Sequence, residues 1–377
     1  MTEVEVLVVG GGPVGSAVAL ELQRRGREVL LVDAGAAAHK ICGEGILPLG
    51  WSILQELGVA NKIERLAPIT ELVYQLPEAS RDSLPRLRAE LSLPSHGVER
   101  AELMKAFSLC LREARVERWE ATRFRGLEVE PRGVRVRLEG QRAGELRCRL
   151  LIGADGLHSR VRGQAGLHCA RPRRFFRWGT RVYFRENSCR AGVTVTLGEG
   201  VETYLTPLGD GLHGLAFLWS PALLGRPPEG EGPLWSRLLE RFPQAYRRTL
   251  PPLEAFWGAD RAIGPLQQRV CSPLHPSGRI ALLGDAGGYL DALTGEGLCL
   301  GLAQAMSLAE LYQSGRIINY PWRHRLLKLR HILVVSALLR LLERPPLKRA
   351  VFSTLLRFPG LFQRLLTAVV EGGARRV

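Results

Sequence analysis

The chain has 377 residues, of which 46% are hydrophobic, and its formal net charge is +15 at pH 7. This length exceeds a minimal domain and favours a two-domain architecture with a substantial core. No apolar run of about 18 residues occurs, so no membrane-spanning helix is expected. The seven cysteines form no CxxC pair, which argues against a disulfide framework or a metal site. We therefore expect a cytoplasmic protein without a signal peptide.

The positive charge is concentrated near the C-terminal end. Residues 316–377 hold thirteen Arg or Lys and two acids, so 11 of the 15 net positive charges lie there. Such a segment favours an anionic partner, either an anionic membrane surface at the periphery of the membrane or an acidic carrier protein. The alternative is that its apolar face covers the rest of the molecule while its charges are solvated. No nucleic-acid-binding motif accompanies the charge, so no nucleic acid is expected as a partner.

The first 33 residues predict a strand–helix–strand unit that binds a dinucleotide. An apolar strand leads into the motif Gly10-x-Gly12-Pro13-x-Gly15. Gly10 permits a tight turn, Gly12 lets the backbone approach a pyrophosphate, and Gly15 lets helix and strand pack closely. The helix that begins at Pro13 offers backbone N–H groups and its positive dipole end to the phosphates.

An acid closes this unit. Asp33 follows the second apolar strand, residues 28–32, and can accept hydrogen bonds from ribose hydroxyls. A carboxylate here disfavours a 2′-phosphate, so the bound nucleotide is expected to be FAD or NAD rather than NADP. The chain holds one such fingerprint, so a second nicotinamide site would be shared or transient.

Further along the chain, helical and extended patterns alternate in a way that predicts two interleaved domains. Helices are expected at 51–57, 100–114 and 297–312, and three basic amphipathic helices within 321–377. Strands are expected at 123–129, 134–139, 146–152 and 279–283, with a set of short alternating strands at 175–219. A glycine-rich loop is expected at 40–50. The short strands predict an antiparallel sheet, and the strand at 279–283 predicts a return to the first domain.

Two further motifs follow the glycine motif in a fixed order. They are Asp155-Gly156, inside residues 154–162, and Gly284-Asp285-Ala286. The ordered set resembles the flavoprotein hydroxylase superfamily of the p-hydroxybenzoate hydroxylase fold, over about residues 3–312. This resemblance implies that the first motif binds the ADP part of FAD. It also implies that Asp155 helps to hold FAD and transient NAD(P)H, and that Gly284 and Asp285 meet the ribityl chain.

The resemblance also implies the domain arrangement. We expect an α/β fold in which a Rossmann-like FAD domain, a parallel sheet with helices, is interleaved with an antiparallel-sheet substrate domain and followed by a helical tail. The boundaries are 1–70, 100–173 and 265–320 for the FAD domain, 71–99 and 174–264 for the substrate domain, and 321–377 for the tail. Arg100 is expected beside the FAD phosphates or the ribityl chain.

Two segments resemble the geranylgeranyl-reductase-like branch of this superfamily. They are residues 291–297 (Asp-Ala-Leu-Thr-Gly-Glu-Gly) and the loop 40–45 (Lys-Ile-Cys-Gly-Glu-Gly). Backbone N–H groups of Gly295 to Gly297, at a helix start, can stabilise negative charge on the N1–C2=O edge of reduced flavin. Gly43 would bring the loop backbone close to the ring from another side.

Four side chains are candidates for chemistry at the flavin. Glu44, Glu296 and Asp291 are the carboxylates expected near the ring, where one of them can serve as general acid or base, and the alternative for all three is structural hydrogen bonding within their loops. Cys42 is a candidate redox or nucleophilic residue. It has no partner cysteine at redox spacing, and its alternative is a small residue packed near the flavin.

Three aromatic residues are candidates for a substrate pocket. Tyr183, Tyr204 and Trp219 lie on expected strands of the second domain. Because alternate residues of a strand share a face, the same side chains can instead belong to the core.

Two family signatures are absent or reduced. The halogenase signature Trp-x-Trp-x-Ile-Pro does not occur at residues 175–180, so halogenation is not expected. The lipid-reductase signature of the Tyr-x-Trp-x-Phe-Pro type is reduced to Tyr204-Leu205-Thr206-Pro207.

The resemblance implies an NAD(P)H-dependent monooxygenase that hydroxylates or epoxidises a lipophilic or carrier-tethered substrate through a C4a-hydroperoxyflavin. One alternative is a flavin ene-reductase or dehydrogenase that acts on a prenyl or polyketide C=C bond. Another is a flavin-bearing protein that docks a carrier and has no turnover of its own.

Overall fold

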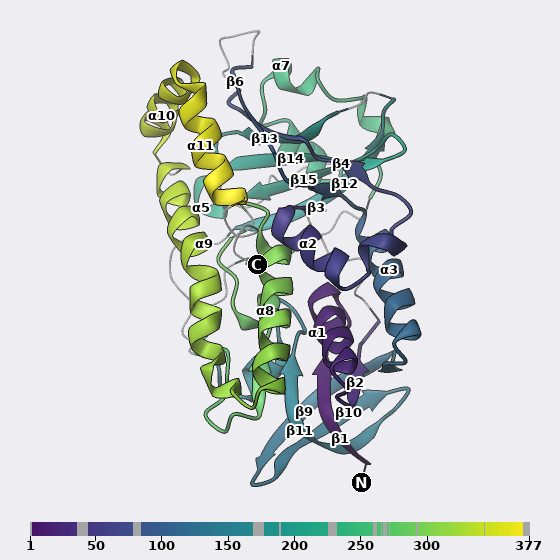
Figure 1. Cartoon of the computed structure of the whole chain (residues 1–377). Coiled ribbons are helices and arrows are strands. Elements are labelled where there is room, and N and C mark those ends of the chain that lie inside the picture. Colours follow the sequence, from purple (N-terminus) through teal and green to yellow (C-terminus); the bar gives the residue numbers. More distant parts are fainter. Residues whose placement is uncertain are drawn as a thin grey trace.

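The computed structural model describes residues 2–35, 44–77, 84–168, 177–187, 190–224, 232–258, 262–264, 266, 270, 272–291, 293–342 and 344–371. Figure 1 shows two sheets, one in the lower and one in the upper half of the molecule, with the last helices along one side. We call the lower half the first domain, the upper half the second domain, and residues 320–371 the tail.

The first domain is built on a sheet of mixed direction. Its strand order is β8 (Glu117–Trp119), β2 (Val29–Val32), β1 (Thr2–Val9), β11 (Gly144–Gly153), β10 (Gly133–Gly140) and β9 (Thr122–Glu130), and β16 (Ile280–Leu282) also pairs with β11. Strands β8, β2, β1, β11 and β16 pair in parallel, whereas β9, β10 and β11 pair antiparallel. The predicted parallel sheet with helices is therefore confirmed, with an antiparallel extension.

Both faces of this sheet are buried, which explains the continuous apolar run at the start of the chain. Val6 and Val8 face a core formed with α1 (Pro13–Arg24), α2 (Pro48–Glu56), α3 (Arg100–Glu113) and α8 (Gly297–Gln313). Leu7 and Val9 face the other side, where they pack with Val134 of β10 and with residues near α4 (Arg160–Gln164). A small third sheet, in the order β3 (Gly45–Ile46), β7 (His96–Gly97) and β4 (Ala67–Pro68), lies against β14 (Val201–Gly209). The remaining short elements are η2 (Ala60–Lys62), η4 (Gly284–Gly287) and η5 (Ile317–Asn319).

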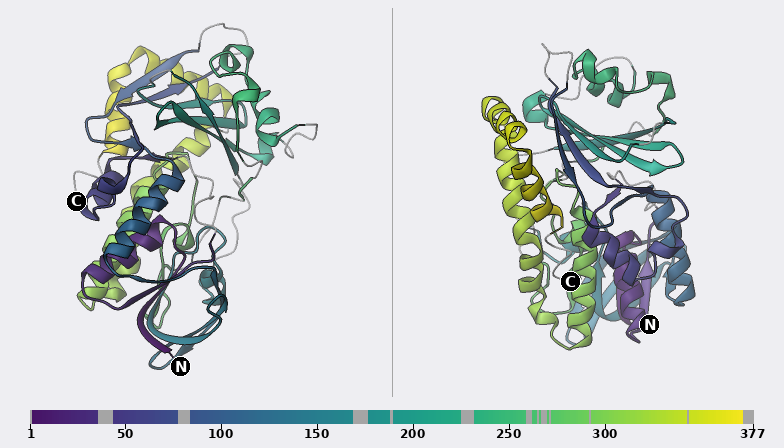
Figure 2. Two further views of the ribbon diagram at one scale, coloured as in Figure 1. Left: turned by 90° about the vertical axis from the view of Figure 1, so that its right-hand side faces the viewer. Right: turned by 45° about the horizontal axis from the view of Figure 1, so that its top comes forward.

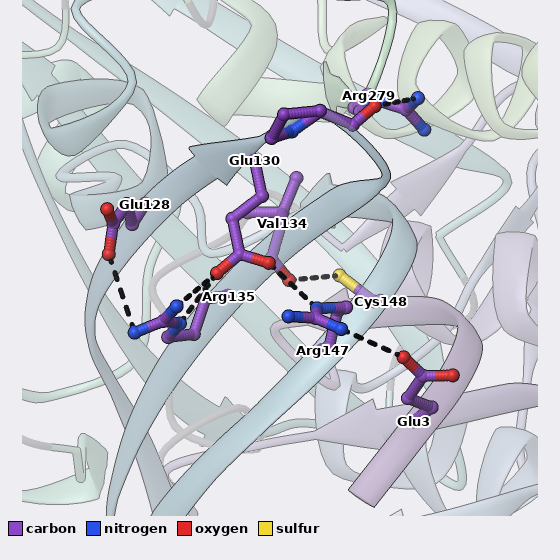
Figure 3. Close-up of polar contacts among 9 residues, drawn as sticks. Glu3, Glu128, Glu130, Val134, Arg135, Arg147, Cys148 and Arg279 are labelled. Atoms are coloured by element: carbon purple, nitrogen blue, oxygen red, sulfur yellow. Dashed lines mark hydrogen bonds and ion pairs between the residues drawn. The ribbon is translucent and has the colours of Figure 1, made fainter. Parts of the chain in front are cut away.

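Charged side chains connect the antiparallel strands to the N-terminal end of β1 (Figure 3). Glu130 accepts from Arg135 and Arg147, both at 2.7 Å, and Arg147 also lies 3.2 Å from Glu3. These ion pairs are exposed to solvent, so screening keeps their contribution to stability small. They support the register of the strands without reaching the site described below.

The second domain is a sheet in the order β12 (Trp178–Arg185), β15 (Leu212–Trp219), β14 (Val201–Gly209), β13 (Gly192–Leu197), β5 (Glu71–Gln75) and β6 (Arg86–Glu90). The strands are antiparallel, as expected, except that β5 and β13 run in parallel. This pairing joins a segment near residue 70 to one near residue 190, so the two domains are interleaved in sequence.

The two faces of the second sheet have different partners. Phe184, Phe217 and Trp219 pack on one face with α6 (Leu234–Leu239), α7 (Gln244–Arg247) and residues near η3 (Leu253–Ala255). α5 (Pro221–Leu224) follows β15. The other face is turned toward the first domain and the tail (Figures 1 and 2).

The tail consists of α9 (Tyr320–Leu342), α10 (Pro345–Arg357) and α11 (Pro359–Val370). Gln363 of α11 makes two hydrogen bonds with the backbone of Glu90, both at 2.8 Å, and so covers the edge of β6. Phe352 and Phe362 pack against Leu87 and its neighbours on the second sheet. The tail is thus packed on both domains (Figure 2).

Candidate FAD site

The glycine motif and the Asp155 motif meet where two parallel strands end. Ala154, directly after β11, donates its N–H to Val9 O of β1 at 2.8 Å. Gly10 has a φ of +108°, and a Cβ there would lie only 2.5 Å from Ala154 O. Only glycine fits both the left-handed backbone and this close approach. Position 10 therefore requires glycine for two reasons, which are the left-handed backbone of its own turn and the close approach of Ala154 in the second motif.

An arginine connects the second motif to the third. Arg162 donates through Nη2 to Leu157 O at 2.8 Å and through Nη1 to Ala286 O at 3.1 Å. Gly284, which opens the third motif, lies against Val14 in the first turn of α1, because a Cβ on it would be 3.3 Å from Val14 Cγ2. All three motifs thus touch one another around the N-terminus of α1.

The N-terminus of α1 has the features of a phosphate site. Gly12 is its N-cap, no side chain among the described residues caps it, and Pro13 occupies the first helical position. The guanidinium of Arg100 lies beside Gly12, with Nη2 3.4 Å from the place where a Cβ on Gly12 would be. A helix N-terminus with an adjacent arginine suits a pyrophosphate through both dipole and charge-assisted hydrogen bonds.

Asp33 is oriented by the backbone at the end of β2. Its Oδ2 accepts from Gly11 N–H and its Oδ1 from Gly35 N–H, each at 2.6 Å. An ionised carboxylate has about four lone-pair sites, so further acceptor capacity remains for ribose hydroxyls. Its place next to the glycine turn fits the expected adenosine end of FAD.

Asp155 is built into the start of α4. Its carboxylate accepts from Ser159 Oγ at 2.5 Å, Arg160 N at 2.7 Å and Val161 N at 3.1 Å. Burial raises the pKa of Asp155, against the lowering effect of these hydrogen bonds. The structure thus gives Asp155 a capping role, and contact with a cofactor stays a prediction.

Glu44 lies in a buried polar cluster between the domains. Its Oε1 is 2.8 Å from Arg181 Nη1 and accepts from Tyr183 Oη at 2.9 Å and from Arg100 N at 2.7 Å. Burial raises the pKa of Glu44 to about 6, although Arg181 opposes the shift. Cys42 and Gly43 of the same loop lie outside the described residues.

A second buried cluster occupies the face of the second sheet that is turned to the first domain. Arg177 lies 2.5 Å from Glu202 and 3.5 Å from Asp291, and the hydroxyl of Tyr204 lies 3.0 Å from Glu202. Burial raises the pKa of Asp291 to about 6. Sequence reasoning singled out Tyr204 but missed Arg177 and Glu202. The alternation of β14, which puts residues 202 and 204 on one face, is the signal that could have found Glu202.

The tail supplies partners to the start of α8 and to the segment that follows the third motif, and sequence reasoning missed these partners. Glu296, the N-cap of α8, lies 3.0 Å from His331 Nδ1 and 3.3 Å from Arg330 Nη2, both from α9. Lys328 donates to Gly288 O at 2.5 Å, and burial lowers the pKa of Lys328 to about 8 while Asp285 opposes this. Helix spacing alone could not reveal these contacts between distant segments.

Gly295 and Gly297 occupy the start of α8, as expected. Gly295 has a φ of +66°, and within the part of the chain that the structure describes no heavy atom lies within 4 Å of a Cβ built on it. Gly297 is the first residue of the helix. The backbone is therefore open to a ligand at Gly295. This place fits the expected contact with the polar edge of a flavin.

Two of the three aromatic candidates for the substrate pocket lie on the expected face of the second sheet, and the third, Trp219, does not. Tyr183 and Tyr204 lie on the sheet face turned to the first domain, where they reach Glu44 and Glu202. Trp219 pairs with Val201 and Trp178 and is fully buried in the core on the opposite face. The expectation that Trp219 lines a pocket with the two tyrosines is wrong. Tyr183 and Tyr204 lie opposite even-numbered residues of β15, whereas Trp219 is odd-numbered and points to the other face of the sheet.

The fold and the site define an FAD-dependent oxidoreductase. A family model described as "FAD binding domain" matches residues 3–312, and the chain belongs to that family. The glycine turn, the oriented carboxylate and the arginine beside α1 fit FAD. Bound FAD would supply the redox chemistry, and the protein would position and shield it.

Known proteins agree with this assignment. The chain is 28% identical over 321 residues to digeranylgeranylglycerophospholipid reductase 1 of Methanothermobacter thermautotrophicus, which covers 81% of this chain and 76% of the relative. It is 24% identical over 355 residues to 3-demethoxyubiquinol 3-hydroxylase of Escherichia coli, which covers 84% and 82%. The structure of p-nitrophenol 4-monooxygenase PnpA from Pseudomonas putida DLL-E4 shares the fold, with a TM-score of 0.78, 19% identity and coverage of 99% and 98%. The expected resemblance to flavin hydroxylases and to the geranylgeranyl-reductase-like branch is confirmed.

No helix among the described residues is both long enough and apolar enough to cross a membrane.

Proposed function

We propose that this enzyme is an NAD(P)H-dependent monooxygenase that hydroxylates or epoxidises a lipophilic substrate through an oxygen adduct at flavin C4a. One observation carries the proposal. Leu157 after the second motif, Leu218 of β15 and Leu266 are buried together where the two domains meet. Tyr204 and Tyr289 pack against them. A substrate bound at this junction would meet mainly apolar side chains, which favours a lipophilic molecule.

The polar groups at this junction are held in place rather than exposed. Arg177 and Glu202 neutralise each other, and Tyr204 is oriented by Glu202 and by Leu293 O at 3.1 Å. The single O–H of Tyr204 is thus directed to Glu202 and Leu293 O, and its phenol oxygen keeps the capacity to accept a hydrogen bond from a substrate hydroxyl. Burial raises the pKa of Tyr204 well above the ordinary value, so the phenol stays protonated at neutral pH.

Glu44 and Asp291 can hold protons near neutral pH. The pKa of each is raised by burial to about 6, so each can give up or take a proton with little driving force. A monooxygenase must protonate the oxygen atom that leaves as water. We assign this proton supply to the Glu44 cluster, where Tyr183 and Arg181 fix the carboxyl group.

The names of two similar proteins support oxygenation. The relative from Escherichia coli, which is matched over 82% of its length, is named as a hydroxylase, and the structure from Pseudomonas putida is named as a monooxygenase. The second candidate function is ene-reduction of a prenyl C=C bond, with hydride from reduced flavin and the proton from Glu44 or Asp291. It is favoured by these two protonatable carboxyl groups and by the relative named as a reductase.

Rapid mixing separates the two candidates. The holoenzyme is reduced anaerobically with NADPH or NADH and then mixed with oxygenated buffer, with and without a prenylated quinone as probe. We expect a transient absorbance band at shorter wavelength than that of oxidised flavin, and incorporation of isotopically labelled oxygen into the probe. Reoxidation without that band, together with saturation of a probe C=C bond under anaerobic conditions, would overturn the monooxygenase and support the reductase.

A further inference from the structure

We propose that α9 and α11 form a membrane-binding surface that lies on an anionic lipid bilayer without crossing it. The proposal concerns how the enzyme is placed in the cell and does not depend on which reaction it performs. It starts from an unusual distribution of apolar side chains. Of the fourteen large apolar side chains that are exposed among the described residues, ten lie between residues 322 and 365.

Helix α9 presents apolar side chains to solvent. Trp322, Leu326, Leu329 and Leu333 are 63%, 47%, 52% and 62% exposed. Their spacing of four, three and four residues places them in one stripe along the helix. At 1.5 Å per residue, this stripe is about 16 Å long.

The inner side of α9 carries both apolar and polar residues, and Val335 and Leu339 are buried there against Leu293. His324 and His331 are both buried, and Lys328 is inserted toward Gly288 O. His331 contacts Glu296 at the start of α8. The exposed stripe is therefore not a packing face that lacks its partner, because α9 is already fixed to the molecule through its other side.

Helix α11 extends the apolar surface. Phe358, which precedes it, and Leu361 and Leu365 are exposed at the same helical spacing. α9 and α11 are in contact, since Arg330 Nη1 donates to Ala368 O at 3.1 Å. Figures 1 and 2 show the two helices on the same side of the molecule. An exposed apolar patch spread over two adjacent helices marks an interaction surface.

Arginines border the apolar stripe. On a helix of 3.6 residues per turn, Arg323 lies to one side of the Trp322–Leu333 line and Arg325 to the other. Residues 320–371 contain ten Arg or Lys and two acids. An apolar stripe with Trp, flanked by basic residues, is the pattern of a helix that lies in the membrane interface.

The charge also decides among the alternative occupants. A second copy docked symmetrically would oppose the same basic surface to itself, so like charges would face each other. The acidic side chains of a carrier protein would form ion pairs with the arginines, but the long apolar stripe would remain exposed to water. Anionic lipids satisfy both features, because headgroups pair with the arginines while the boundary of the acyl chains covers Trp322 and the leucines.

The test measures co-sedimentation of the full-length, flavin-loaded protein with vesicles. Vesicles of phosphatidylcholine are compared with vesicles that also contain phosphatidylglycerol, at low and high salt. We expect binding that requires phosphatidylglycerol and weakens with salt. The triple variant Leu326→Gln/Leu329→Gln/Leu333→Gln should bind at least about tenfold more weakly, because three inserted apolar side chains are lost. The matched control is Leu253→Gln, an exposed leucine on the second domain.

A second measurement locates the contact. Brominated lipids should quench part of the tryptophan fluorescence, and Trp322→Phe should remove most of that quenching. Absence of binding to anionic vesicles, or equal binding by the triple variant and the wild type, overturns the proposal. So does a concentration-dependent dimer of the wild type that the triple variant abolishes, because that result assigns the stripe to a second copy. Flavin content, measured for every variant, shows that the fold is intact.

Discussion

Tyr183 donates its phenolic hydrogen to Oε1 of Glu44 at 2.9 Å, and this hydrogen bond joins the second domain to the loop before β3. Arg181, two residues earlier on the same strand face, places its Nη1 2.8 Å from the same oxygen. Glu44 also holds the first N–H of α3. One buried carboxyl group therefore ties together the sheet of the second domain, the loop 44–46 and the helix that carries Arg100.

Protonation of Glu44 should make the free energy of unfolding depend on pH. Burial raises the pKa of Glu44 from 4.5 to about 6. The folded state thus binds the proton more tightly than the unfolded state. Its stabilising contribution is complete below pH 4.5 and is lost as the pH rises through about 6. We expect Glu44→Gln to remove a decline of about 2 kcal/mol in the free energy of unfolding over this range.

Denaturant unfolding between pH 4 and pH 7.5 checks this expectation. Asp291, whose pKa burial also raises to about 6, continues to contribute in the variant, so the decline should shrink rather than vanish. Glu254→Gln, at an exposed position, serves as the control and should retain the wild-type slope. If the free energy of unfolding changes with pH equally in Glu44→Gln and in the wild type, the raised pKa of Glu44 is contradicted.

Gly10→Ala should abolish stable retention of flavin. The new Cβ would lie 2.5 Å from Ala154 O in a backbone with φ of +108°, and strain of this kind costs about 1–3 kcal/mol before the clash is counted. The ratio of flavin absorbance to protein after gel filtration measures retention. Gly163→Ala is the matched control, because a Cβ there meets no heavy atom within 4 Å. Equal flavin content in both variants would show that the turn can relax.

Arg162→Lys should loosen the link between the second and third motifs. A lysine cannot reach Leu157 O and Ala286 O together in the fork geometry of a guanidinium, so one buried carbonyl loses its donor. We expect a loss of about 1–3 kcal/mol in unfolding free energy. The neighbouring Arg160→Lys, at an exposed position, should leave stability unchanged. Thermal unfolding of the two variants side by side decides the point.

Buried thiols should resist alkylation in the folded protein. Burial raises the pKa of Cys148 and of Cys299 to about 12, so little reactive thiolate exists at neutral pH. Iodoacetamide followed by peptide mass spectrometry should label both residues only after the protein is unfolded in guanidinium. Rapid native labelling at either position would mean that the surrounding helices open frequently.

Much of the first domain could be predicted because its signals are local. Gly10, Gly12 and Asp33 lie within one strand–helix–strand unit, where spacing along the chain fixes spacing in the structure. The helix that starts at residue 297 and the breaks at Pro345 and Pro359 are local in the same sense. Residue type and period were sufficient in these cases.

The partners of the candidate catalytic groups could not be predicted in this way. Glu44 contacts Arg181 across 137 positions of sequence, and Glu296 contacts His331 through a different helix. The orientation of Trp219 depended on which face of its strand meets the first domain. Periodicity gives two faces without saying which of them is inward.

The sequence by itself therefore indicated the class of cofactor, because the glycine motif and Asp33 lie close together in the chain, and the resemblance carried by the ordered motifs indicated the fold. Only the tertiary structure decided which side of α9 is buried and which carboxyl groups are removed from water. Those outcomes depend on surfaces contributed by distant segments, and burial is a property of the assembled molecule that no single segment contains.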